Sequence, residues 1–197
     1  FPVEAVQEIA GRILSQDPIG AMQYSITEGY VPLRENIKKV ILSEEPILKD
    51  GDDLVIVSGA QQGIELTCKA LCNPGDTVLC ESPSFVGSLN SFKSYGGNLV
   101  GIDLEEDGIS LDKLEQALKT EKNVKFLYLI PNFQNPSGRT MSLSKRKAVL
   151  ALAEQYDFLI LEDNPYGALR FAGEDIPSIK SLDETGRVIY CGTFSKI

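Results

Sequence analysis

The 197-residue sequence contains no histidine. Catalysis by Ser–His or Cys–His pairs is therefore excluded, as is most zinc chemistry, because these sites depend on imidazole. The four cysteines show no CxxC spacing; they are Cys68, Cys72, Cys80 and Cys191. We expect them to be reduced and buried in a cytoplasmic protein, and we expect no metal site.

Long apolar runs and an excess of positive charge are also missing. No apolar stretch approaches the ~18 residues that a membrane span needs, and the first residues lack a signal-peptide pattern. The 19 Lys and Arg residues are outnumbered by 28 Asp and Glu residues, which gives a net charge of -9. We therefore expect no membrane contact and no nucleic-acid partner for this segment.

From residue 52 onward, short apolar runs alternate with helical patterns. Predicted strands cover residues 54–57, 77–80, 98–103, 126–130, 158–161 and 188–191, and helical patterns separate most of them. Continuous apolar runs indicate strands buried on both faces, and strands that alternate with helices indicate a parallel sheet. We therefore predict an α/β fold: a doubly wound, mostly parallel sheet with helices on both faces. Ligands of such sheets bind at the carboxyl ends of the strands.

The first 50 residues show two helical patterns separated by a polar, turn-like stretch at residues 23–30. Apolar residues recur at helical spacing within residues 1–15, and Pro32 opens a second helical pattern that reaches residue 42. We expect residues 1–50 to be a helical segment that leads into one larger domain of residues 51–197. A chain of this length is long enough to bury a proper core.

Two predicted strand ends can hold an anion. Gly59, Ala60 and Gln61 follow one strand and begin a helix, where small residues let backbone N–H groups approach a phosphate and the helix dipole favours it. The alternative is a tight turn that needs small residues. At the end of the last predicted strand, the hydroxyls of Thr193 and Ser195 can also bind an anion.

Lys196 follows these hydroxyl residues directly. Lysine is the side chain that forms Schiff bases with carbonyl cofactors when the basicity of its amine is lowered. The alternative for a single lysine after a strand is an ordinary solvated surface charge.

Other predicted strand ends carry an aromatic ring, an amide, a carboxylate and a phenol. Phe85 can stack on a planar ligand, although a helix staple or core residue is the favoured interpretation when Phe85 is judged alone. Asn135 lies in a loop whose backbone is fixed by two prolines and a glycine, so its amide is presented rigidly; the alternative is a plain loop. Asp163 follows a buried strand, where a carboxylate is costly without a cationic partner. The alternative for Asp163 is a helix cap or turn residue, which is favoured when this residue is judged alone. Tyr166 adds a phenol on the same turn.

Together these groups describe one ligand. It has a phosphate, a flat ring with an oxygen substituent, a protonated ring nitrogen for Asp163 and an aldehyde for Lys196. Pyridoxal 5′-phosphate has all of these features. Each alternative is reasonable alone, but their coincidence at five strand ends favours the shared site.

The sequence resembles the aspartate aminotransferase superfamily, the fold-type I pyridoxal enzymes, and especially the branch of aminoadipate and kynurenine aminotransferases. The matching motifs occur in the expected order along nearly the whole chain: Gln23-Tyr24 with Glu28-Gly29 and Leu33-Arg34, Ser58-Gly59-Ala60-Gln61-Gln62, Asn135-Pro136-Ser137-Gly138, Glu162-Asp163-Asn164-Pro165-Tyr166 and Thr193-Phe194-Ser195-Lys196. The resemblance implies that residues 51–197 are the cofactor-binding large domain, which stops just after its Schiff-base lysine. The chain is thus expected to be a fragment.

The resemblance also implies roles for single residues. Lys196 holds the cofactor and moves a proton, while Asp163 pairs with the ring nitrogen. Asn135 and Tyr166 face the ring hydroxyl. Phe85 stacks on the ring, and the phosphate is held by Gly59, Ala60, Gln61, Thr193 and Ser195. Tyr24 reaches the phosphate in the partner subunit, so a homodimer is expected.

The implied activity is transfer of an amino group between an α-amino acid and a 2-oxo acid. Two alternatives remain open. A β-lyase or decarboxylase on the same scaffold shares every residue named above. An aminotransferase-like effector domain of a transcription regulator shares them too, and differs by a DNA-binding segment upstream of these residues.

Overall fold

A computed structural model describes residues 2–196, without the side chains of residues 41–44. Phe1, predicted to begin the first helix, lies outside the described residues. The centre is a six-stranded sheet in the order β3-β2-β1-β4-β5-β6. The strands are β1 (Thr77–Ser82), β2 (Asn98–Glu105), β3 (Gly108–Ile109), β4 (Val124–Leu129), β5 (Leu159–Asn164) and β6 (Val188–Gly192). Adjacent strands are parallel except for the antiparallel β2–β3 pair.

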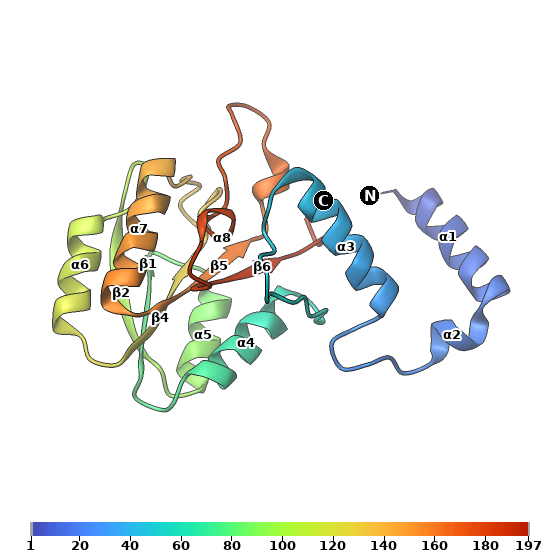
Figure 1. The fold of residues 1–197 in the computed structure, drawn as a ribbon, viewed down its shortest axis with the longest axis horizontal. Coiled ribbons are helices and arrows are strands. Elements are labelled where there is room, and N and C mark those ends of the chain that lie inside the picture. The colour runs from blue at the N-terminus through green and yellow to red at the C-terminus, as the bar shows by residue number, and fades with distance from the viewer. Residues whose placement is uncertain (1, 197) are drawn as a thin grey trace.

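Helices cover both faces of the sheet (Figure 1). On one face, α4 (Ala60–Leu71) and α5 (Val86–Ser94) pack on strand residues such as Val78 and Phe126. On the other face, α6 (Leu111–Thr120), α7 (Leu143–Tyr156) and α8 (Ile179–Leu182) pack on residues such as Leu79 and Leu127. Successive strand residues point to opposite faces, so the central strands β1, β4 and β5 are buried on both sides. The predicted doubly wound α/β fold is confirmed.

The N-terminal helices lie apart from the sheet. In Figure 1, α1 (Val3–Gln16) and α2 (Pro18–Met22) extend away from the remainder of the molecule, and no residue of either helix is buried. Asp17 ends α1 and caps α2, because its Oδ1 accepts a hydrogen bond from the Gly20 N–H at 3.0 Å. The sequence predicted only a break at this point, so α2 is an addition.

The third N-terminal helix is tied to the chain that precedes α4. In α3 (Val31–Glu44), the Arg34 guanidinium donates from Nε to the Leu54 carbonyl at 2.7 Å and pairs with Asp53 at 2.6 Å. This anchors residues 53 and 54, although they form no strand.

The predicted strand at residues 54–57 is wrong for the described residues, because this run is extended but pairs with no strand of the sheet. Its Ile56 N–H donates instead to the Glu28 carbonyl at 2.9 Å. Apolar composition identifies an extended run, but a strand also needs a neighbouring ladder. Strand ends shift as well: β5 continues through Asn164, so Asp163 lies within a strand rather than after it.

Within the described residues, the helices are too short or too polar to cross a bilayer.

Candidate active site

Asp163 is a buried carboxylate near the carboxyl end of β5, with a relative exposure of 4%. Its Oδ2 accepts a hydrogen bond from the Tyr128 hydroxyl at 2.7 Å. Its Oδ1 is buried and has no hydrogen-bond partner among the described residues. Burial raises the pKa of Asp163 to about 6, and the Tyr128 hydrogen bond opposes that rise.

The unpartnered oxygen is the best test of whether a pyridoxal cofactor fits here. A buried carboxylate oxygen without a donor is costly, and a protonated nitrogen on a ligand removes that cost. The residues present therefore fit the cofactor whose ring nitrogen was predicted to face Asp163.

A chain of contacts joins this carboxylate to α5 and α4. The Ser88 hydroxyl of α5 donates to the Tyr128 oxygen at 2.9 Å. The Gln61 side-chain amide of α4 donates to the Ser91 hydroxyl at 2.5 Å and to the Gly87 carbonyl at 3.3 Å. The first turns of α4 and α5 thus lie side by side on the face of the sheet that carries Tyr128.

The predicted phosphate cup is the start of α4. Gly59 occupies the N-cap position with a φ of 84°, a left-handed conformation that favours glycine. The backbone N–H groups of Ala60 and Gln61 belong to the first turn, where no carbonyl of the helix can accept from them. Because the Gln61 side chain is engaged with α5, its backbone N–H is the group that remains available to an anion. The cup therefore relies on the main chain.

The end of β6 brings the hydroxyl residues and the lysine to the same edge. The pairing of Asp163 with Cys191 sets the position of the turn that follows, and the Cys191 thiol lies 3.8 Å from the Ala60 carbonyl. In the turn, the Thr193 and Ser195 hydroxyls lie 2.9 Å apart. Lys196 is exposed and forms no hydrogen bond or ion pair with the described residues. Its amine is available, but nothing in the described chain fixes its direction.

Asn135 and Tyr166 share a groove. Two loops line this open space of about 560 Å³, one from Phe133 to Gly138 and one from Tyr166 to Ala172. The Asn132 amide donates to the Asn164 side-chain oxygen at 3.0 Å and so ties the first loop to the end of β5. The structure therefore brings Asn135 and Tyr166 together beside the strand that carries Asp163.

Phe85 is at the surface rather than in the core. It is the N-cap residue of α5 and is 36% exposed. A Cβ atom added to Gly87 would lie 2.6 Å from the Phe85 ring, so the ring is seated against that glycine. An exposed ring beside the α4 cup can stack on a planar ligand.

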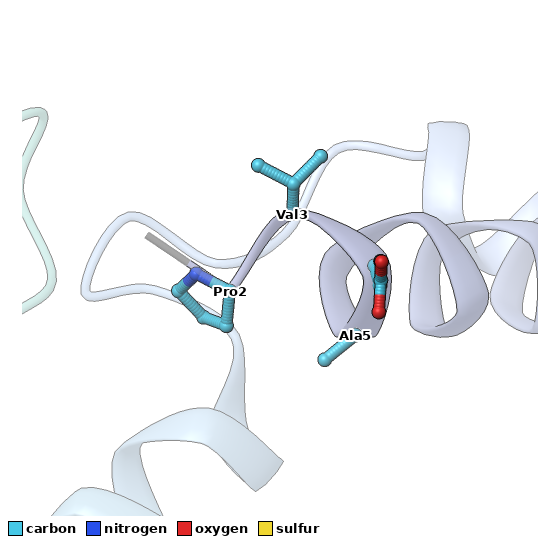
Figure 2. Close-up of a pocket in the computed structure, with 4 residues that line it drawn as sticks. Pro2, Val3 and Ala5 are labelled. Atoms are coloured by element: carbon cyan, nitrogen blue, oxygen red, sulfur yellow. The ribbon is translucent and has the colours of Figure 1, made fainter.

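Tyr24 is not brought to this site. It follows α2 and is fully exposed, with a relative exposure of 103%. Figure 2 shows the start of the same N-terminal segment, where a second hollow is lined by Pro2, Val3, Glu4 and Ala5. None of the predicted site residues lines that hollow.

Sequence reasoning missed three buried residues behind the site. The sequence indicates Tyr128 only as part of an apolar strand. Gln134 donates from Nε2 to the Pro83 carbonyl at 2.8 Å, and its Oε1 accepts from the Ser137 N–H at 2.9 Å, so it braces the Asn135 loop. Glu81 accepts from the Ile130 N–H at 3.0 Å. Glu81 had the same signal as Asp163, a carboxylate that ends an apolar run.

Glu81→Gln is expected to stabilise the protein at alkaline pH. Burial raises the pKa of Glu81 to about 8, from an ordinary value of 4.5. Between these values the folded state binds more protons than the unfolded state, so the stability contributed by this group falls as pH rises. Glutamine mimics the neutral acid and removes that loss. Thermal melts should show the variant several degrees above the parent at about pH 8 and level with it at about pH 5. An equal difference at both pH values would contradict the assignment.

The sequence matches the family described as aminotransferase class I and II over residues 2–197. The chain belongs to this family. Aromatic-amino-acid aminotransferase 1 of Thermococcus litoralis is 44% identical over 201 residues, covering 100% of this chain and 48% of the relative. This aminotransferase-family chain thus spans about half the length of the curated relatives it matches.

A solved relative and a regulator extend the comparison. The crystal structure of Pyrococcus horikoshii kynurenine aminotransferase, in complex with PMP and substrates, has a TM-score of 0.96 and 42% identity, and the match covers 100% of this aminotransferase-family chain and 50% of that chain. An uncharacterized HTH-type transcriptional regulator of Escherichia coli (strain K12) is 35% identical, covering 94% of this chain and 39% of the relative.

Proposed function

We propose that the protein is a pyridoxal-phosphate-dependent aminotransferase that moves an amino group between an α-amino acid and a 2-oxo acid. The observation that carries this proposal is the buried Asp163 carboxylate, one of whose oxygens has no partner among the described residues, at the edge where the α4 cup and the Lys196 turn meet. Family membership and named aminotransferase relatives support it. The cofactor, when bound, supplies an electron sink for charge that develops on the substrate α-carbon.

Each predicted site residue has a separate role in this proposal. Asp163 keeps a proton on the ring nitrogen, because a buried carboxylate and a cation favour each other's charged forms. The α4 cup, with the Thr193 and Ser195 hydroxyls, holds the phosphate. Phe85 stacks on the ring, while Asn135 and Tyr166 donate to its oxygen substituent. Lys196 would supply the amine that holds the cofactor aldehyde, and it would carry the proton between the substrate α-carbon and the aldehyde carbon of the cofactor.

We also propose the assembly and the location. Residues 51–197 form the cofactor-binding domain, residues 1–50 lead into it, and the protein acts as a cytoplasmic homodimer. The exposure of Tyr24, away from every other predicted site residue, fits a role in the partner subunit.

The activity is tested in the full-length protein by a single half-reaction. The protein is loaded with pyridoxal phosphate, and an α-amino acid is added without any 2-oxo acid. We expect up to one equivalent of 2-oxo acid per site, together with a shift of the cofactor absorbance. Release of pyruvate with ammonia, or of carbon dioxide, would instead indicate the β-lyase or decarboxylase alternative.

The regulator alternative has one specific observation in its favour, the similarity to an HTH-type regulator. Its test is the coding sequence upstream of these residues together with the same half-reaction. A DNA-binding segment combined with no turnover would favour the regulator over the enzyme.

A shared site predicts that two defective subunits repair each other. In a mixed dimer of Lys196→Ala and Tyr24→Ala subunits, one site has both lesions and the other has neither. We expect activity per intact Lys196 to rise above that of the Tyr24→Ala protein alone. Tyr30→Ala, which changes another exposed tyrosine of this segment, serves as the control for Tyr24→Ala and should retain activity. Mixed dimers that form without any gain in activity would contradict the shared site.

A further inference from the structure

Tyr128 makes the single hydrogen bond that the Asp163 carboxylate receives within the described part of the chain. The tyrosine is fully buried in β4, and the hydrogen bond spans two adjacent strands of the sheet. One carboxylate oxygen is thereby occupied at 2.7 Å and the other is left over. The Tyr128 hydrogen bond thus fixes the orientation of the carboxylate, and it leaves Oδ1 as the oxygen that can accept a further hydrogen bond.

We propose that Tyr128 is a positioning residue of the proposed aminotransferase: its hydroxyl orients Asp163 and keeps it charged, so that Oδ1 alone accepts a hydrogen bond from the protonated ring nitrogen of the cofactor. This inference rests on the proposed function. It adds a residue that touches the cofactor only through Asp163.

The direction of the Tyr128 proton follows from Ser88. A phenol carries a single proton, and the Ser88 hydroxyl donates to the Tyr128 oxygen at 2.9 Å. The Tyr128 proton is therefore directed to Asp163, which makes a charge-assisted hydrogen bond when the carboxylate is ionised. Burial, followed by the nearby Asp163 charge, raises the pKa of Tyr128, so the phenol stays a donor throughout the working range of pH.

The other groups near Asp163 do not orient its carboxylate by a hydrogen bond within the described residues. Cys191 of β6 faces the carboxylate, and its thiol stays neutral because burial, together with the Asp163 charge, raises its pKa to about 12. The charge of Glu81 in β1 contributes to the raised pKa of Tyr128, whereas the pKa of Asp163 is set by burial and by the Tyr128 hydrogen bond. From α5, Ser88 brings a hydroxyl and no charge.

Core packing is the competing role for Tyr128. Its ring packs edge-on against Phe92 with centroids 5.4 Å apart. Tyr128→Phe keeps that ring and removes only the hydroxyl, so it separates the two roles.

The experiment measures the affinity of the full-length protein for pyridoxal phosphate by absorbance as a function of pH. Without the phenol, Asp163 becomes harder to ionise, and one pKa unit corresponds to about tenfold in the charged fraction. We expect Tyr128→Phe to bind the cofactor about tenfold more weakly than the parent near pH 6. This ratio should shrink towards a small constant above pH 8, where Asp163 is ionised in both proteins.

Tyr190→Phe is the matched control. This partly buried tyrosine lies in β6, on the other side of β5, and its oxygen accepts from the Asn164 amide at 2.9 Å without reaching Asp163. Its affinity ratio should not depend on pH. If Tyr128→Phe does not fold, Ser88→Ala should give a smaller loss of affinity with the same pH dependence.

Each outcome decides between the two claims. A parent protein that binds the cofactor, combined with a variant ratio that is the same at all pH values, overturns the role of Tyr128 and leaves the proposed function intact. A parent protein that does not bind pyridoxal phosphate overturns both.

Discussion

Replacement of Lys196 by alanine is expected to abolish the visible absorbance of covalently held pyridoxal phosphate and to lower turnover by at least 10²–10⁴-fold, roughly the contribution of a positioned acid–base group. The exposed Lys196 side chain is the one amine among the described residues of the turn after β6, and the chain contains no histidine to replace it. Absorbance spectra and the half-reaction with an amino acid measure the two effects.

The control for this variant is Lys122→Ala, which removes another exposed lysine. It should keep both the spectrum and the turnover. A Lys196→Ala protein with a normal spectrum, or with substantial turnover, would show that another amine holds the cofactor.

Asp163→Asn is expected to slow the half-reaction about a hundredfold, because a charge-assisted pair with the ring nitrogen becomes a neutral contact. Cofactor binding should survive in part, since asparagine keeps a hydrogen-bonding group in the same space. Asp163→Ala should bind the cofactor more weakly than the asparagine variant, because it leaves the Tyr128 hydroxyl without its acceptor. Equilibrium binding and single-turnover rates separate the two substitutions.

Asp157→Asn is the matched control for the lost charge. Asp157 lies just before β5, where its carboxylate pairs with Arg187 at 2.7 Å on the surface. Near-normal turnover of Asp163→Asn would mean that Asp163 has only a structural role, as the acceptor of the Tyr128 hydrogen bond between β4 and β5.

The order of strands and helices could be read from the sequence because apolar periodicity is a local property. Runs such as 77–80 and 188–191 coincide closely with β1 and β6. The run at 54–57 has the same composition, yet forms no strand, because its neighbours decide the pairing and the chain ties it to Glu28 and Arg34 instead. The amino-acid composition of a segment does not show whether a neighbouring strand is in place to form backbone hydrogen bonds with it.

The predicted site residues are those whose chemistry is unusual for their position, such as Asp163 beside a buried strand. Tyr128 escaped notice because tyrosine suits an apolar strand and its contact with Asp163 lies 35 residues away in sequence. Gln134 was hidden in the same way by the motif around Asn135. The predicted role of Tyr24 differs from both cases, because it depends on a second subunit.

The central claim is that Lys196 carries the cofactor. The most direct measurement is reduction of the full-length, pyridoxal-loaded protein with borohydride, followed by protease digestion and mass spectrometry of the labelled peptide. We predict that the cofactor mass is found on the peptide that contains Lys196 and that the label is lost in Lys196→Ala. A label on a different lysine, with Lys196 intact and unmodified, would contradict the account.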